Sequence, residues 1–104
     1  MNRLNRLAMK YPKLDLACLQ ILQWVAEEHG LACADIANLL NTDHNYVHYR
    51  VNLMAGGIKG REKYGMDLIN TTPDPLHHKR QLLSLTKAGK EVIQLLKPFM
   101  EDKQ

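Results

Sequence analysis

Apolar residues recur at three- and four-residue spacing in four stretches of this 104-residue chain, a pattern typical of helices with one buried face. The first predicted helix runs from Asp15 to His29, where Asp15 is a suitable N-cap and Gly30 a natural stop. Its buried stripe is expected to contain Leu16, Leu19, Leu22, Val25 and Ala26. A shorter helix is predicted from Ala34 to Leu40, with its inward face formed by Ile36, Ala37, Leu39 and Leu40.

A third helix is predicted after a polar break of the length used in a helix-turn-helix. The break is Asn41-Thr42-Asp43, in which Thr42 or Asp43 can cap a helix over about residues 43–54. Apolar side chains at i, i+4 and i+7 mark its inward face, namely Val47, Val51 and Met54. The residues expected to point outward are Asn45, His48, Tyr49 and Asn52.

This outward face combines amide, imidazole and phenol groups, which is unusual for a helix that only covers a core. Asparagine can pair bidentately with adenine, and histidine and tyrosine can donate to acceptors on base edges and phosphates. Arg50 lies at the margin of the face and is better placed for a phosphate. The third helix is therefore interpreted as a DNA recognition helix.

The pattern then changes from helices to short strands. Gly65 to Ile69 is predicted as one strand, Pro73-Asp74-Pro75 favours a bend, and Gln81 to Leu85 forms a second strand. Basic or titratable residues lie at or beside the bend, namely His78, Lys79 and Arg80. Thr86 can cap a last helix from Lys87 to Gln104, which Pro98 should bend or end. One side of that helix is expected to carry Val92, Ile93, Leu96 and Met100.

This order of bend, cations, strand and helix start resembles the wing of MarR-type winged-helix transcription regulators. That wing reads approximately D-P-x-D-x-R, followed by a strand and L-T-x-x-G, and Asp74-Pro75 and Leu85-Thr86-Lys87-Ala88-Gly89 match it. Histidine at 77 or 78 replaces the second acidic residue, and Lys79 or Arg80 holds the arginine position. The resemblance covers roughly residues 16–96. It implies a mainly α fold with a small β-hairpin wing, a winged helix-turn-helix.

The segment from Ala55 to Gly65 contains four glycines and is predicted to be a flexible loop. In the family pattern the recognition helix passes almost directly into the first wing strand, so the loop resembles an insertion of roughly ten residues. Lys59, Arg61 and Lys63 alternate along it. Two interpretations stay open, a solvated loop without a partner and an additional set of phosphate contacts.

The whole chain has a net charge of +3, and its positive charge is concentrated in two parts. Residues 1–13 carry four cations and no anion, residues 47–80 carry six cations and three anions, and residues 14–46 carry five anions and no cation. This distribution is typical of a nucleic-acid-binding face with an acidic back. Three regions are expected: a basic N-terminal arm or short helix at 1–13, a winged helix-turn-helix DNA-binding domain at 14–86, and a C-terminal helix at 87–104 as a candidate dimerisation element.

Other classes of protein have weaker support. No run of residues has the length and apolarity of a membrane span or a signal segment, which predicts a cytoplasmic protein. Cys18 and Cys33 are interpreted as buried side chains, with a redox-sensing thiol as the alternative. The motifs of a phosphate loop or a nucleophile elbow are missing, so neither an enzyme nor a cofactor is expected. A metal-responsive regulator is a minor alternative, based on His44, His48, His77 and His78.

The sequence thus predicts a sequence-specific double-stranded DNA-binding transcription regulator, with the third helix in the major groove and a wing of about residues 66–85 on the minor groove or backbone. The predicted DNA-binding residues are Thr42, Asn45, His48, Tyr49, Arg50, Asn52, Lys59, Arg61, Lys63, His78, Lys79 and Arg80. A homodimer is expected because a lone winged helix offers few phosphate contacts. The resemblance places effector pockets beside dimerisation helices that are short here, so a small-molecule effector is not expected. The alternative is a protein-interaction winged helix, such as an accessory or phage-type factor without sequence-specific DNA binding.

Overall fold

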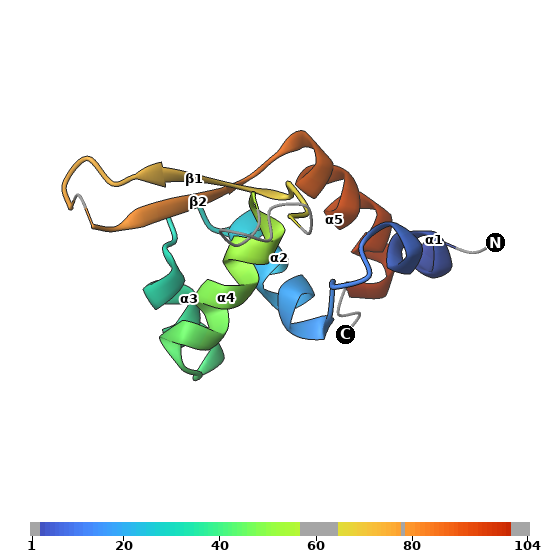
Figure 1. The fold of residues 1–104 in the computed structure, drawn as a ribbon, viewed down its shortest axis with the longest axis horizontal. Coiled ribbons are helices and arrows are strands. Elements are labelled where there is room, and N and C mark those ends of the chain that lie inside the picture. Colours follow the sequence, from blue (N-terminus) through green and yellow to red (C-terminus); the bar gives the residue numbers. More distant parts are fainter. Residues whose placement is uncertain (1–2, 57–64, 78, 101–104) are drawn as a thin grey trace.

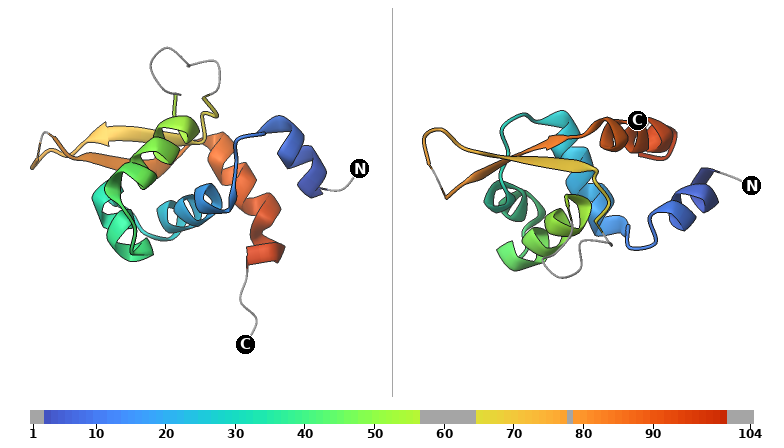
Figure 2. Two further views of the ribbon diagram at one scale, coloured as in Figure 1. Left: turned by 60° about the horizontal axis from the view of Figure 1, so that its bottom comes forward. Right: turned by 45° about the horizontal axis from the view of Figure 1, so that its top comes forward.

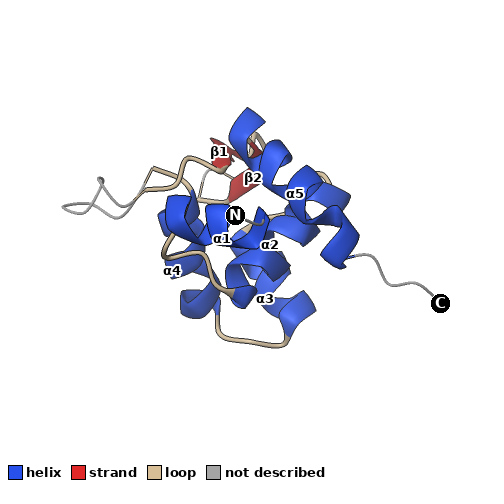
Figure 3. Ribbon diagram, turned by 90° about the vertical axis from the view of Figure 1, so that its right-hand side faces the viewer, coloured by secondary structure: helices blue, strands red, loops and turns tan. Residues whose placement is uncertain are grey.

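Five helices and one antiparallel hairpin make up the computed structural model, which describes residues 3–56, 65–77 and 79–100 (Figure 1). The elements are α1 (Arg3–Lys10), α2 (Leu16–Glu27), α3 (Cys33–Leu40), α4 (His44–Met54), β1 (Ile69–Pro73), β2 (Gln81–Leu85) and α5 (Lys87–Met100). Helices form most of the fold and the two strands a small part of it (Figure 3). The predicted mainly α winged helix-turn-helix with a hairpin wing is therefore confirmed. Among the described residues, no helix is both long and apolar enough to span a membrane.

Helix α2 lies at the centre of the fold and packs against α4, β2 and α5, while α3 packs against α4 and β2. A single core results, whose largest fully buried side chains are Ile21, Leu22, Ile36, Met54, Leu68 and Leu96. The hairpin extends away from the helices, and α1 and α5 lie toward the opposite end (Figure 2). The wing and α4 are thus held by one core, which fixes their relative orientation.

The buried faces of two helices differ from the predicted stripes. Leu16, the first residue of α2, is 80% exposed, and the buried side chains of α2 are instead Ala17, Cys18, Ile21, Leu22 and Val25. The face is rotated because the small residues at 17 and 18 pack closely against the core, leaving Leu16 on the outer side. Leu39 of α3 is 47% exposed, and the buried residues there are Cys33, Ile36 and Ala37.

The ends of the helices also differ slightly from the predicted ones. Helix α2 ends at Glu27 with the extended Glu28 as its C-cap, two residues before the predicted end at His29, and Gly30, with a left-handed φ of 78°, lies in the turn that follows and does not cap the helix. Helix α5 runs past Pro98 to Met100, so the proline does not end it. Pro98 lies in the last turn, where losing one backbone donor affects little of the helix.

The first wing strand begins later than predicted, at Ile69 instead of Gly65. The backbone amides of residues 66–68 bond to the end of α4 and are not available to pair with β2. Met66 N donates to Leu53 O at 2.9 Å and Leu68 N to Met54 O at 2.6 Å. Asp67 N donates to Ala55 O at 2.9 Å. These bonds satisfy carbonyls at the end of α4 that have no partner within the helix. The predicted loop at 55–65 falls mostly on residues 57–64, outside the described part of the chain.

The second strand and the start of the last helix are confirmed. Strand β2 covers Gln81–Leu85 and pairs with β1 in a register that places Ile69 opposite Leu85 and Pro73 opposite Gln81. Thr86 Oγ1 accepts a hydrogen bond from Gly89 N at 3.0 Å, as expected of an N-cap. Leu83 N also donates to Leu31 O at 2.8 Å, which joins β2 to the segment that precedes α3.

Candidate nucleic-acid interface

A tight turn sets the direction of α4. Asn41 adopts a left-handed conformation with φ of 53°, and Thr42 N donates to Ala37 O at 2.9 Å, which ends α3. Asp43 then caps α4 by accepting a hydrogen bond from Asn45 N at 2.9 Å. With Val47 and Val51 in the core, the side chains of α4 that are exposed include Asn45, His48 and Tyr49. The predicted inward face of this helix is confirmed, and Asn45, His48 and Tyr49 are exposed as predicted, whereas Asn52 is half-buried.

A groove of about 600 Å³ separates α4 from the wing. One wall is formed by α4 through His44, His48 and Asn52, and the other by the wing through Thr71, His77, Lys79, Arg80 and Gln81. Its floor is apolar and comes from Ala32, Cys33, Ala34, Val51 and Leu83. Sequence-predicted residues that lie far apart in the chain, His48 and Asn52 on α4 and Lys79 and Arg80 on the wing, thus face one groove.

The α4 wall of this groove is an ordered row of rings and amides. The rings of His44 and His48 stack with centroids 5.7 Å apart, and Asn52 Nδ2 lies 3.4 Å from His48 Nδ1. Within the described residues, no group of three or more metal-ligating side chains comes together. The arrangement instead offers donors and acceptors along one helix face, which is the chemistry of base-edge recognition.

Arg80 on the wing is held by two carboxylates. Its guanidinium pairs with Asp35 of α3, and its Nε lies 3.3 Å from Asp74 Oδ2 at the start of the hairpin turn. Asp35 also accepts a hydrogen bond from Ala32 N at 2.8 Å. Burial would raise the pKa of Asp35, but the bonds from Ala32 and Arg80 and the charge of Arg80 outweigh it and hold that pKa below the usual value. Arg80 therefore connects the wing to α3, and its charge is largely neutralised.

Arg50, predicted to contact a phosphate, is similarly engaged. Its Nη2 lies 3.2 Å from Asp15 Oδ2, and its guanidinium sits over the Tyr46 ring, 3.8 Å from the centroid. Asp15 is also the N-cap of α2, where it accepts a bond from Cys18 N at 2.8 Å. Arg50 Nε is buried and is the one buried side-chain polar atom in the described chain without a hydrogen-bond partner. This cluster ties α4 to the start of α2.

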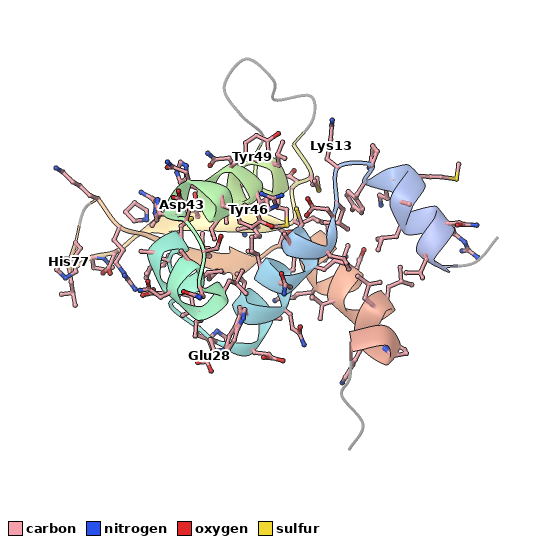
Figure 4. All side chains as sticks on the ribbon, turned by 90° about the horizontal axis from the view of Figure 1, so that it is seen from below. Lys13, Glu28, Asp43, Tyr46, Tyr49 and His77 are labelled. Carbon is pink, nitrogen blue, oxygen red and sulfur yellow. The ribbon has the colours of Figure 1, made fainter. Side chains whose placement is uncertain are left out.

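Because Arg50 and Arg80 are paired, the positive charge around α4 and the wing depends on cations that make no ion pair. Among the described residues, Lys79 and Lys13 are exposed and make no ion pair. Figure 4 shows His77 at the end of the molecule that carries the wing tip, while Tyr49 and Lys13 point toward one edge and Glu28 lies at the opposite edge. Thr42 is half-buried in the turn before α4. The predicted contacts Lys59, Arg61, Lys63 and His78 lie outside the described residues.

Sequence reasoning did not select several groove residues. Thr71 and Gln81 line the wing wall, and each lies two positions from a buried strand residue, Ile69 and Leu83 respectively, so the period-2 pattern that puts them on the same face of the hairpin was a usable signal. Asp35 of α3 was not among the residues predicted to contact DNA. Its pairing with Arg80 spans 45 positions and leaves no local pattern in the sequence.

Both cysteines are buried, in agreement with their interpretation as small core side chains. Burial raises the pKa of the Cys18 thiol to about 11, and burial also raises the pKa of Cys33. Because the thiolate is the reactive form, both side chains are poor nucleophiles near neutral pH.

Neither protein-family models nor curated protein sequences give a match to this chain. Solved structures do. The transcriptional regulator Tm0710 from Thermotoga maritima superimposes with a TM-score of 0.69 and 22% identity, over 89% of this chain and 59% of its own. The adhesin competence repressor AdcR from Streptococcus pyogenes gives 0.66 and 20% identity, over 90% and 63%. MarR gives 0.63 and 18% identity, over 94% and 69%.

The first two of these regulators are considerably longer than the part that aligns, since this chain spans less than two thirds of each. The superpositions with Tm0710 and MarR cover 89% and 94% of this chain. The resemblance to MarR-type regulators, first indicated by the wing residues, is thereby confirmed at the level of structure: the chain has the MarR-type winged-helix fold.

Proposed function

We propose that this protein binds double-stranded DNA at specific sequences and regulates transcription. The observation that carries the proposal is the groove between α4 and the wing, because it aligns an exposed polar helix face with a hairpin bearing the exposed Lys79, which forms no ion pair with any described residue. Helix α4 would enter the major groove with Asn45, His48, Tyr49 and Asn52, and the wing would lie on the minor groove or backbone. The DNA strand between the two grooves would then follow the cleft.

Electrostatic attraction in this proposal rests on few residues. Lys79 supplies the wing contact to phosphate, and Lys59, Arg61 and Lys63 are predicted to add more. Arg80 and Arg50 orient the wing and the recognition helix through their ion pairs and contribute less direct attraction. Because one copy offers so few phosphate contacts, we propose that a homodimer binds a two-fold symmetric site, in the cytoplasm where DNA is accessible.

One observation favours the alternative, a winged helix that binds another protein. Two of the predicted DNA-contacting cations are already paired with carboxylates, and Asp43 adds an exposed negative charge at the start of α4. Asp43 is used as a cap, however, and the unpaired Lys79 faces the same groove. A direct binding experiment separates the two functions.

The experiment is fluorescence anisotropy with a pool of random duplexes, titrated at several salt concentrations. Binding should weaken steeply with salt, and Lys79→Ala should lower the slope of log K against log salt by about 0.9 for each bound copy, one phosphate contact per copy. Lys90→Ala is the matched control, since Lys90 is an exposed lysine on α5 and should leave the slope unchanged. Lys79 is a cleaner probe than Arg80, whose removal would also loosen the wing.

Selection from the same pool then tests specificity. Successive rounds should enrich one sequence with two half-sites separated by about one helical turn, as a dimer with two recognition helices requires. Enrichment of no sequence, with salt-dependent binding intact, would contradict sequence-specific regulation. Absence of binding at low salt would contradict DNA binding and favour the protein-interaction alternative.

A further inference from the structure

The tip of the wing presents a bare apolar side chain. Leu76 is 85% exposed, more than any other large apolar residue in the described chain. It belongs to the turn between β1 and β2, at the end of the hairpin that projects from the helices (Figure 1). A single exposed leucine is ordinary on a protein surface, so its exposure alone carries no function.

Several hydrogen bonds hold the backbone on either side of Leu76. Asp74 Oδ1 accepts from Leu76 N at 2.9 Å, Asp74 N donates to Arg80 O at 2.8 Å, and Arg80 N donates to His77 O at 2.9 Å. Pro73 and Pro75 fix two further φ angles around the same turn. The backbone of residues 73–77 is therefore constrained before any partner binds.

The tip is also anchored to the body of the protein. Arg80 joins Asp74, the residue that organises the turn, to Asp35 on α3. A flexible turn would let a leucine fold back onto apolar surface, but this chain of bonds keeps Leu76 pointing away from the core. Lys79, exposed and without an ion pair among the described residues, lies three positions further along the same turn.

We propose that Pro75-Leu76 is an apolar wedge that enters the DNA minor groove and partly unstacks one base step. The proposal rests on the DNA-binding function proposed above and specifies how the wing acts. Leucine and proline are side chains used in this way by proteins that bend DNA toward the major groove. Lys79 contacts the phosphate beside the inserted tip. The protein thereby bends its site and favours flexible TA or CA/TG steps under the wing.

The test is a bending assay by energy transfer between dyes at the two ends of a duplex that carries the selected site. Wild type should bend the duplex, Leu76→Ser should lose most of the bend and bind about ten-fold more weakly, and Leu76→Met should keep both. Methionine is the matched control because it retains an apolar wedge at the same position. Replacing the flexible step with a stiff A-tract should reduce wild-type affinity but not that of Leu76→Ser.

Equal bending by wild type and Leu76→Ser would overturn the wedge while leaving DNA binding intact. Binding by wild type without any bend would overturn it in the same way. Absence of DNA binding by wild type, measured by anisotropy on the same duplex, would instead overturn the proposed function on which the wedge depends. Because Leu76 is outside the core, thermal melting of both variants should match wild type and exclude misfolding as the cause.

Discussion

Gly89, in the first turn of α5, lies against backbone from the segment before the wing. A Cβ at this position would meet Leu68 O at 2.1 Å, far inside the contact distance of any real side chain. The same carbonyl accepts a hydrogen bond from Thr86 N at 3.1 Å, and Thr86 Oγ1 donates to Asp67 O at 2.7 Å. The glycine of the L-T-x-x-G motif is thus required by the close approach of α5 to residues 67–68.

Replacing Gly89 with alanine has two opposing effects on stability. Helix propensity alone would make Gly89→Ala stabilising by about 1 kcal/mol, whereas the clash with Leu68 O should make it destabilising by about 2–4 kcal/mol. We expect the clash to dominate because the obstructing atom belongs to backbone and cannot rotate away. Thermal and urea unfolding measure the difference.

Gly56→Ala is the control for this prediction, because a Cβ at Gly56 would meet no atom of the described residues within 4 Å. It should change the free energy of unfolding by no more than about 0.5 kcal/mol. If Gly89→Ala melts at or above the wild-type temperature, the close packing of α5 on Leu68 is wrong.

At the scale of elements, the wing is joined to α3 by the pair of Asp35 and Arg80. Both side chains are about one third exposed (32% and 34%), so the pair should contribute at most about 1 kcal/mol to stability. The pKa of Asp35 is lowered in the folded protein. Its stabilising contribution is therefore present above the pKa of the unfolded chain and is lost as the pH falls through the lower folded value.

Asp35→Asn tests this contribution. At pH 7 the free energy of unfolding of the variant should be about 0.5–1 kcal/mol lower than that of wild type. This difference should shrink as the pH falls below about 4. Urea unfolding at pH 7, 5, 4 and 3 measures the difference. Asp67→Asn changes an exposed carboxylate with no ion pair among the described residues, and should match wild type at pH 7. A gap for Asp35→Asn that stays constant down to pH 3 would contradict the ion-pair assignment.

Elements whose signals are local were predictable, and those set by distant partners were not. Strand β2, the Thr86 cap and the inward face of α4 follow from alternation, a capping residue and helical spacing. The predicted start of β1 was wrong because the amides of residues 66–68 donate hydrogen bonds to the carbonyls at the end of α4. The predicted contact residues Arg50 and Arg80 are held by Asp15 and Asp35, partners that lie 35 and 45 positions away.

At the scale of the whole molecule, two ends carry different chemistry. The wing and α4 form one end, where polar side chains line the groove, and α1 and α5 lie toward the other (Figure 1). The α1 and α5 end has a smaller cavity of about 250 Å³, lined by Leu7, Tyr11, Ala88, Val92 and Leu95 together with Arg6, Lys10 and Glu91. This cavity shares no lining residue with the groove between α4 and the wing and is separate from the proposed DNA-binding face.

The short helix α1 gives the strongest reason to expect a partner copy at that end. It has eight residues, and among its described side chains Leu7 is buried while Leu4 and Met9 are 48% and 70% exposed. Helices of this length are marginal in water unless an apolar face is covered. A second copy docked through α1 and α5 would cover Leu4 and Met9 and place two recognition helices on one DNA site.

Sedimentation equilibrium of wild type and of the Leu4→Glu, Met9→Glu variant tests this dimer. Wild type should dimerise at micromolar concentration, whereas two buried carboxylates should weaken association by more than about 100-fold, a cost of roughly 3 kcal/mol. Leu39→Glu is the matched control, because Leu39 on α3 is 47% exposed and lies outside α1 and α5. It should leave association unchanged.

A monomeric wild type at tens of micromolar, or a variant that still dimerises, would contradict the α1 and α5 interface. The monomeric variant should also bind a duplex with two half-sites more weakly than wild type does. Its affinity for a duplex with a single half-site should match that of wild type, because each winged helix remains folded and only the linkage between copies is removed.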